Sequence, residues 1–236
     1  MIKEIIVAGI KLHNYTVPEN LTKIVKNLES NVFTAIEEVD MKTVLLAKEE
    51  ESVKETLESI DVTVIAETGI LDVVGQATLI RKAEIERREF FFQLMKILER
   101  NGYTVYILGE DSKEVQMAEA YIVDAFPRMK ILDSQVLDKV LGIEDKIIND
   151  INMLAPDVIL SVLPSPMQEQ FLKKYKQMLL TKIWYGVGAQ KIAGTRLTFG
   201  AKVLKFFREH MLKRYIAEGQ AQQAQGEKIE KKESEE

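Results

Sequence analysis

The sequence contains no cysteine, which excludes disulfide bridges, thiolate nucleophiles and cysteine-ligated metals. Its two histidines, His13 and His210, lie near opposite ends of the chain, which argues against a histidine metal cluster and against serine–histidine catalysis. No run approaches the roughly 20 apolar residues of a membrane span, and the start M-I-K-E-I-I-V lacks the apolar core of a signal peptide. We therefore expect a cytoplasmic protein.

The sequence also lacks an excess of basic residues, since its net charge is −5. We therefore expect no binding to nucleic acid. The 236 residues are 46% hydrophobic, which is enough for a substantial core in one large domain or two small ones. Segments with strand and helix patterns alternate from end to end. This alternation predicts an α/β fold with a Rossmann-like, mostly parallel sheet flanked by helices.

The most informative stretch runs from residue 149 to 171. A helix ends at Pro156, which has no N–H group to continue it. Residues 158–163 form a continuous apolar run, which is typical of a strand covered on both faces. Residues 164–166, P-S-P, then force a bend, and Gln168 and Glu169 follow in the first turn of a new helix. Open α/β sheets bind ligands at this end of their strands, so both side chains are candidate ligand contacts.

The same stretch resembles the WecG/TagA/CpsF family of bacterial glycosyltransferases. The family's I-N-x-x-x-P-D segment reads here as residues 151–157, and its G-x-P-x-Q-E segment as residues 164–169. The resemblance extends from about residue 5 to 216. It implies an inverting, metal-independent enzyme without a cofactor, which moves a hexosamine from a UDP-sugar to a polyprenyl-diphosphate-linked sugar in cell-surface polymer synthesis. Gln168 and Glu169 would then contact the substrate and its nucleotide.

The resemblance is weakest at the catalytic loops. Where the family has P-D-G, with the Asp as general base, this chain has Glu67-Thr68-Gly69. Thr68 therefore occupies the position of the base, and a neutral hydroxyl is a poor base near neutral pH. Glu67 is one residue away and would serve only with a shifted backbone. Both residues are the catalytic candidates that this loop offers.

Two further substrate contacts follow from the resemblance. Asp40, with Glu38 before it, stands in a loop that resembles the family's T-P-N-P-E, although acidic residues at a helix N-terminus also favour the helix dipole. Arg81 matches an arginine placed to hold a phosphate or sugar. The alternative for residues 81–89, R-K-A-E-I-E-R-R-E, is a solvated helix face with pairs of opposite charge.

Glycines follow two of the expected strands. Gly109 matches the family's backbone cradle for phosphate, but Glu110 and Asp111 follow it with negative charge. Gly186 and Gly188 resemble a family segment next to the nucleotide, and Gln190 is a candidate contact there. The alternative is an ordinary glycine-rich turn between strand and helix.

The C-terminal part is expected to be separate from the α/β domain of residues 1–200. The pattern of residues 201–217 predicts a basic amphipathic helix. Residues 202–216 of this helix are expected either to bind an anionic membrane surface or to dock on the domain. Residues 218–236 are polar and are expected to form a mobile tail.

Three hypotheses remain from the sequence. The first is the glycosyltransferase, peripheral at the inner face of the cell membrane, with a UDP-sugar donor and a lipid-linked acceptor as partners. The second is a catalytically inactive relative that binds or regulates a partner. The third is an unrelated nucleotide- or sugar-binding α/β protein, and in each case a homo-oligomer stays open.

Overall fold

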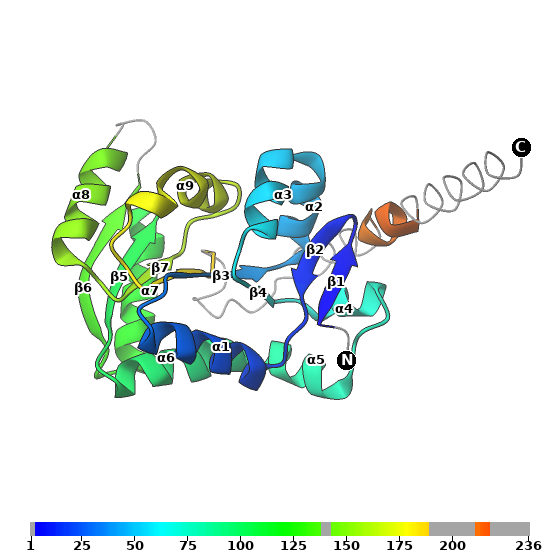
Figure 1. Ribbon diagram of the computed structural model, residues 1–236, viewed down its shortest axis with the longest axis horizontal. Helices are drawn as coiled ribbons and strands as arrows, with labels where there is room; N and C mark the ends of the chain where they lie inside the picture. The colour runs from blue at the N-terminus through cyan, green and yellow to red at the C-terminus, as the bar shows by residue number, and fades with distance from the viewer. Residues whose placement is uncertain (1–2, 138–142, 189–210, 218–236) are drawn as a thin grey trace, which may run out of the picture.

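A computed structural model of the chain describes residues 3–137, 143–188 and 211–217 (Figure 1). Its main sheet has six strands, and every neighbouring pair in it is parallel. In spatial order the strands are β4 (Val62–Ile65), β3 (Thr34–Val39), β8 (Ile183–Gly186), β7 (Val158–Ser161), β5 (Thr104–Gly109) and β6 (Lys130–Val136). The predicted α/β fold with a parallel sheet is confirmed.

Helices cover both faces of this sheet (Figure 1). Helices on one face are α1 (Val17–Glu29), α6 (Glu89–Arg100) and α7 (Ser112–Ala125). Helices on the other face are α8 (Glu144–Leu154) and α9 (Met167–Tyr175), and α3 (Glu51–Glu58) lies beside α9. Successive residues of β8 show that this strand is buried on both faces, because Tyr185 packs on Phe90 of α6 and Trp184 stacks on Phe171 of α9.

A small antiparallel hairpin precedes the sheet. Strand β1 (Glu4–Val7) turns into β2 (Ile10–His13) through Ala8 and Gly9, both with positive φ, as a two-residue hairpin turn requires. His13 then lies against the edge strand β4. Its backbone N–H donates to Thr63 Oγ1 over 2.7 Å, and the N–H of Thr63 donates to His13 Nδ1 over 3.2 Å. The hairpin thus protects an open edge of the main sheet.

The remaining helices are short. They are α2 (Met41–Glu49), α4 (Thr68–Val73), α5 (Leu79–Glu86) and the 3-10 turn η1 (Lys176–Met178). Helices α2, α3 and α4 share an apolar cluster with the β1–β2 hairpin, and the described C-terminal helix at 211–217 adds the buried Leu212 to it. None of the helices within the described ranges is long and apolar enough to cross a membrane.

One predicted boundary is wrong. The pattern places a strand at residues 32–36 and a loop from Glu37, but β3 continues through Glu37 and Glu38 to Val39. Glu38 is only 8% exposed, and it accepts a 2.6 Å hydrogen bond from the hydroxyl group of Tyr185 on the neighbouring strand. A buried donor therefore allows a carboxylate inside a central strand, which the local pattern disfavours.

Candidate functional site

A cavity of about 140 Å³ lies at the carboxyl ends of the strands of the main sheet. The strand order explains the position of this cavity. From β3 the next strand, β4, is added on one side, and from β5 the next strand, β6, is added on the other. Loops on the two sides of such a reversal part from each other and leave room for a ligand. The lining residues lie at or after the carboxyl ends of β3, β5, β7 and β8: Glu38, Asp40, Lys42, Thr43, Glu110, Glu114, Pro164, Ser165, Gln168 and Gly188.

Gln168 is the most tightly held of the lining side chains. It stands in the first turn of α9, directly after the bend that follows β7, and only 2% of it is exposed. Its carboxamide packs on Gly186 at the end of β8, where an added Cβ would lie 2.5 Å from the amide. Gly186 is therefore required by contact with Gln168. The Oε1 atom of Gln168 has no hydrogen-bond partner within the described part of the chain.

A polar chain joins the two loops beside Gln168. Asp40 accepts the backbone N–H of Thr43 over 2.8 Å and the hydroxyl of Thr43 over 3.0 Å, as the N-cap of α2. The hydroxyl oxygens of Thr43 and Ser165 lie 3.4 Å apart. Ser165 donates to Glu169 Oε1 over 2.6 Å, and Glu169 is fully buried. The expected helix-terminal role of Asp40 is thus present together with its place in the cavity.

Glu38 forms the floor of the cavity next to β8. Besides the hydrogen bond from Tyr185, the guanidinium group of Arg88 lies 4.0 Å from its carboxylate. Burial raises the pKa of the Tyr185 hydroxyl well above its ordinary value, and the negative charge of Glu38 adds to the shift. Tyr185 consequently stays a hydrogen-bond donor, and the guanidinium group of Arg88 partly balances the negative charge of Glu38.

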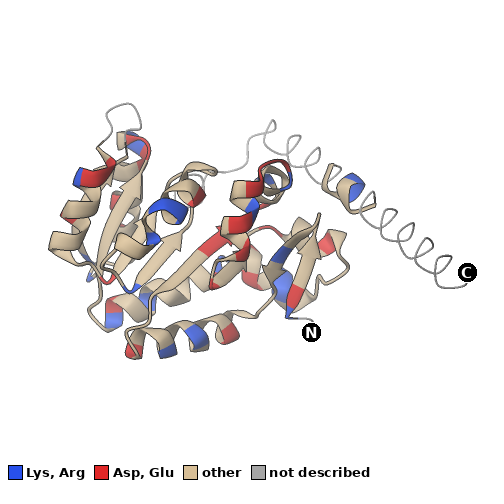
Figure 2. Cartoon of the chain, turned by 45° about the horizontal axis from the view of Figure 1, so that its top comes forward, with Lys and Arg blue, Asp and Glu red and all other residues tan. Residues whose placement is uncertain are grey.

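The lining carries more negative than positive charge. Among the lining residues that the structure describes, four are acidic and one, Lys42, is basic; Figure 2 marks acidic positions in red and basic ones in blue. Burial raises the pKa of Glu114, and the nearby carboxylates of Asp111 and Glu110 raise it further. In the described ranges no three His, Asp or Glu side chains are grouped so that they could hold a metal ion.

The structure brings some of the predicted site residues together. Asp40, Gln168 and Gly188 line the cavity, while Gly186 and Glu169 support it from behind. Gln190 lies outside the described residues. Thr43 and Ser165 are site residues that the sequence analysis does not identify. For Ser165 a signal exists, since it lies between two prolines and four residues before Glu169, whereas no local pattern marks Thr43.

Other predicted residues lie apart from the cavity lining. Thr68 and Glu67 begin α4 at the end of β4, and neither lines the cavity. Gly109 ends β5, where an added Cβ would lie 2.6 Å from Val115 and 2.8 Å from Val162. Gly109 is therefore needed for the packing of α7 on the sheet. The roles assigned to these three residues in catalysis and phosphate binding stay predictions.

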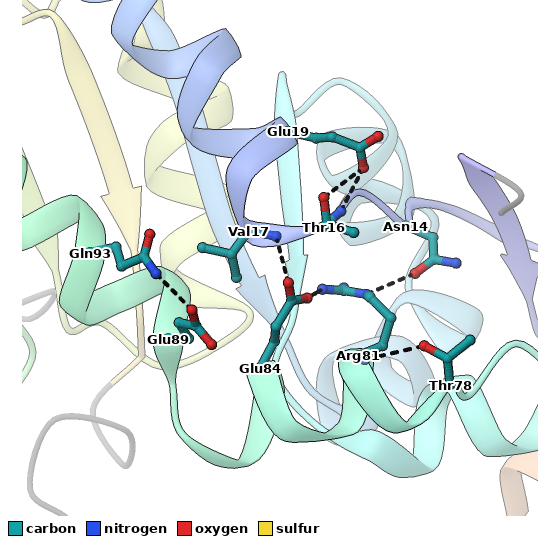
Figure 3. Close-up of polar contacts among 9 residues, drawn as sticks. All are labelled: Asn14, Thr16, Val17, Glu19, Thr78, Arg81, Glu84, Glu89 and Gln93. Carbon is teal, nitrogen blue, oxygen red and sulfur yellow. Dashed lines mark hydrogen bonds and ion pairs between the residues drawn. The ribbon is translucent and has the colours of Figure 1, made fainter.

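Arg81 is held in a buried network that is drawn in Figure 3. Its guanidinium group pairs with Glu84 and donates to Asn14 Oδ1 over 3.4 Å, while Glu84 Oε1 accepts the backbone N–H of Val17 over 3.3 Å. Arg81 is 4% exposed and Glu84 8% exposed. A solvated helix face is therefore wrong for these two residues. The network ties α5 to the connection between β2 and α1, and the predicted phosphate contact of Arg81 stays a prediction.

Comparison with known proteins agrees with this architecture. The sequence model of the glycosyl transferase WecG/TagA/CpsF family matches residues 5–192, which include the six strands of the main sheet and all the described residues that line the cavity. No curated protein matches the chain.

Proposed function

Because the chain belongs to the glycosyl transferase WecG/TagA/CpsF family, we propose that it transfers a hexosamine from a UDP-sugar to a polyprenyl-diphosphate-linked sugar in bacterial cell-surface polymer synthesis. The observation that carries the proposal is the placement of Gln168. Its buried carboxamide is fixed by Gly186 and lines a cavity at the carboxyl ends of four parallel strands. A buried amide with an unused acceptor is suited to bind and orient a polar ligand.

The proposed reaction needs a base for the acceptor sugar. A hydroxyl of the acceptor attacks the anomeric carbon of the donor, loses its proton to the base, and displaces UDP with inversion. Thr68 stands at the family's base position and Glu67 is the adjacent carboxylate. Glu67 is half-buried at the N-terminus of α4, and we assign it this role if the chain is active.

A second candidate is a catalytically inactive relative that uses the same cavity to bind a ligand. Two observations favour it. Thr68 cannot act as a base at neutral pH. The described cavity lining is also acidic, and its negative charge would repel a diphosphate. This candidate shares ligand binding with the first but predicts no sugar transfer, so a transfer assay separates them.

We also propose that residues 202–216 bring the protein to the inner face of the cell membrane, close to a lipid-linked acceptor. In the described part of this segment, Leu212 is buried against the domain while Lys213 is exposed. Such an arrangement leaves positive charge available to anionic lipid headgroups. Flotation of the full chain with anionic liposomes tests it, and neutral liposomes are the control; equal recovery with both would contradict this part of the proposal.

Calorimetric titration with UDP and several UDP-hexosamines, with and without magnesium, tests the donor site. We expect saturable binding that Gln168→Ala weakens by about tenfold, since one buried hydrogen bond is lost. Gln170→Ala, an exposed position on the same helix, is the matched control and should bind as the native chain does. A folded sample that binds none of these ligands at millimolar concentration would refute the transferase.

A further inference from the structure

Helix α7 has a buried face and an outer face of a different character. Three apolar residues of the helix are buried in the core beside β5 and β6: Val115, Ala118 and Ile122. On the outer face Met117 is 43% exposed, and Ala120, one turn further on, is exposed as well. A single exposed apolar side chain is ordinary on a protein surface. The outer face of α7 is unusual because of the order of the residues around these two.

Four exposed residues form one stripe along this face: Lys113, Met117, Ala120 and Asp124. They follow one another at intervals of four, three and four residues. With about 3.6 residues per turn, these intervals keep the four side chains within about 60° around the helix axis, opposite the buried residues. The same intervals bring two helices into lengthwise contact in coiled coils. The stripe is thus suited to a second helix that packs along α7.

The stripe is complementary to its own reverse. Lys113 and Asp124 stand at its two ends with opposite charges, and the large Met117 and the small Ala120 lie symmetrically about its middle. When two copies of α7 pack antiparallel, Lys113 of each copy faces Asp124 of the other, and Met117 of each faces Ala120 of the other. A parallel pair would instead bring lysine against lysine and aspartate against aspartate. Charge complementarity therefore selects the antiparallel pair.

The two charged ends of the stripe are available for such contacts. Within the described ranges, neither Lys113 nor Asp124 forms an ion pair with another side chain, and both are exposed. Other exposed lysines, such as Lys173, are bound by a carboxylate of their own chain. An intermolecular pair at either end of α7 thus replaces no contact within the described chain.

The place of α7 in the fold keeps this surface apart from the segment that is proposed to bind the membrane. Helix α7 packs on β5 and β6, at one edge of the main sheet (Figure 1). The described helix at 211–217 packs with the β1–β2 hairpin, which lies beside β4 at the other edge. Contact between two copies through α7 therefore leaves the C-terminal helix uncovered.

We infer that the chain forms a homodimer in which the outer faces of two α7 helices pack antiparallel around a twofold axis. Such an interface is isologous, since both copies contribute the same residues. The 14 residues of α7 span about 21 Å, so a contact between two such helices is smaller than the roughly 1,200–2,000 Å² of stable complexes. The dimer is consequently weak, with a dissociation constant of about 10–100 µM that rises with salt. The inference does not depend on the proposed function.

Sedimentation equilibrium of the full chain, between about 5 and 500 µM, tests the inference. We expect the native chain to show a reversible monomer–dimer equilibrium. Ala120→Glu should raise the dissociation constant at least about tenfold, because two added carboxylates meet at the centre of the interface. Lys146→Glu, an exposed position of α8 on the other face of the sheet, is the control for a change of charge and should associate as the native chain does.

Exchange of the end charges tests the antiparallel arrangement. Lys113→Glu sets a carboxylate opposite Asp124, and Asp124→Lys sets an ammonium group opposite Lys113. Each substitution alone should raise the dissociation constant by about three- to tenfold. The double variant Lys113→Glu/Asp124→Lys restores opposite charges at both ends and should dimerise within about twofold of the native chain.

Three results would overturn the inference. The native chain could stay monomeric at about 500 µM, Ala120→Glu could associate as the native chain does, or the double variant could associate as weakly as the single variants. An oligomer larger than a dimer that persists in Ala120→Glu counts with the second result. All the substituted positions are exposed, and urea denaturation of each variant verifies that it is folded as stably as the native chain.

Discussion

The carboxamide of Gln168 lies directly on Gly186, so closely that an added Cβ would stand 2.5 Å from it. The two residues lie at the ends of two neighbouring strands. Gln168 stands in the first turn of α9, which follows β7, and Gly186 is the last residue of β8. Their contact therefore fixes the side chain that carries the proposed site, and it gives the glycine a role through packing.

We predict that Gly186→Ala both destabilises the protein and disturbs the cavity. The added methyl group forces Gln168 away, at a cost of about 1–3 kcal/mol in the free energy of unfolding. Urea denaturation measures this cost, and titration with the ligand that binds the native chain should show an affinity like that of Gln168→Ala.

A double variant provides the control. With Gln168→Ala present there is no carboxamide to displace, so Gly186→Ala should cost much less stability than it does alone. If the losses in the free energy of unfolding from the two substitutions add, the added methyl group clashes with atoms other than those of Gln168.

The segment around this contact could be predicted from the sequence, because its signals are local. An apolar run, two prolines and a polar helix start predict β7, the bend and α9 without help from the rest of the chain. For this reason the sequence alone identifies Gln168 and Glu169 as candidate ligand contacts. It does not predict the contact between Gln168 and Gly186, because that contact depends on how two strands are placed side by side.

Arg81 and Glu38 show what local patterns miss. Arg81 stands in a run of charges that is typical of a solvated helix, yet its partner Asn14 is 67 residues away and buries it. Glu38 is paired with Tyr185, which follows 147 residues later. Burial of a charge depends on such distant partners, so neither the end of β3 nor the environment of Arg81 could be read from the sequence.

We predict that Arg81 acts in stability. Arg81→Met leaves Glu84 buried without its cation and should lower the free energy of unfolding by about 3–5 kcal/mol. Combining it with Glu84→Met should restore most of the loss, because two apolar side chains replace the pair. Lys82→Met, which breaks an exposed ion pair with Asp72, is the control and should change stability little.

Ligand titration of this double variant decides the role of Arg81 in binding. We expect the folded Arg81→Met/Glu84→Met variant to bind as the native chain does, since Arg81 does not line the cavity. A loss of affinity for UDP-hexosamines with retained stability would instead support the phosphate contact that the family resemblance implies.

We predict a pH-dependent contribution to stability from His13. Burial lowers the pKa of His13, and the positive charge of Lys23 lowers it further. The unfolded state therefore takes up the proton first, at about pH 6.5. The contribution is complete above that pH and is lost as the pH falls through the lowered pKa, when protonated Nδ1 no longer accepts the N–H of Thr63.

Comparison with His13→Asn isolates this contribution. The amide oxygen of asparagine can take the place of Nδ1 and does not titrate in this range. We expect the difference in urea midpoint between the two proteins to change between about pH 7 and pH 5, with the native chain losing more stability. A difference that stays constant over this range would show that His13 does not titrate with folding.

The last prediction concerns the missing base. Native protein should transfer sugar slowly, because Glu67 lies one residue from the family's base position, and Thr68→Asp should raise the rate by about 100-fold or more, since a positioned base contributes roughly that factor. The substitution is tolerated structurally, because Thr68 is the first residue of α4 and an acidic side chain there favours the helix dipole. Thr68→Asn has the same shape without basicity and should not raise the rate. If the native chain transfers sugar well and Thr68→Asp changes nothing, the base lies elsewhere, and Glu67→Gln then tests whether the neighbouring carboxylate has taken over that role.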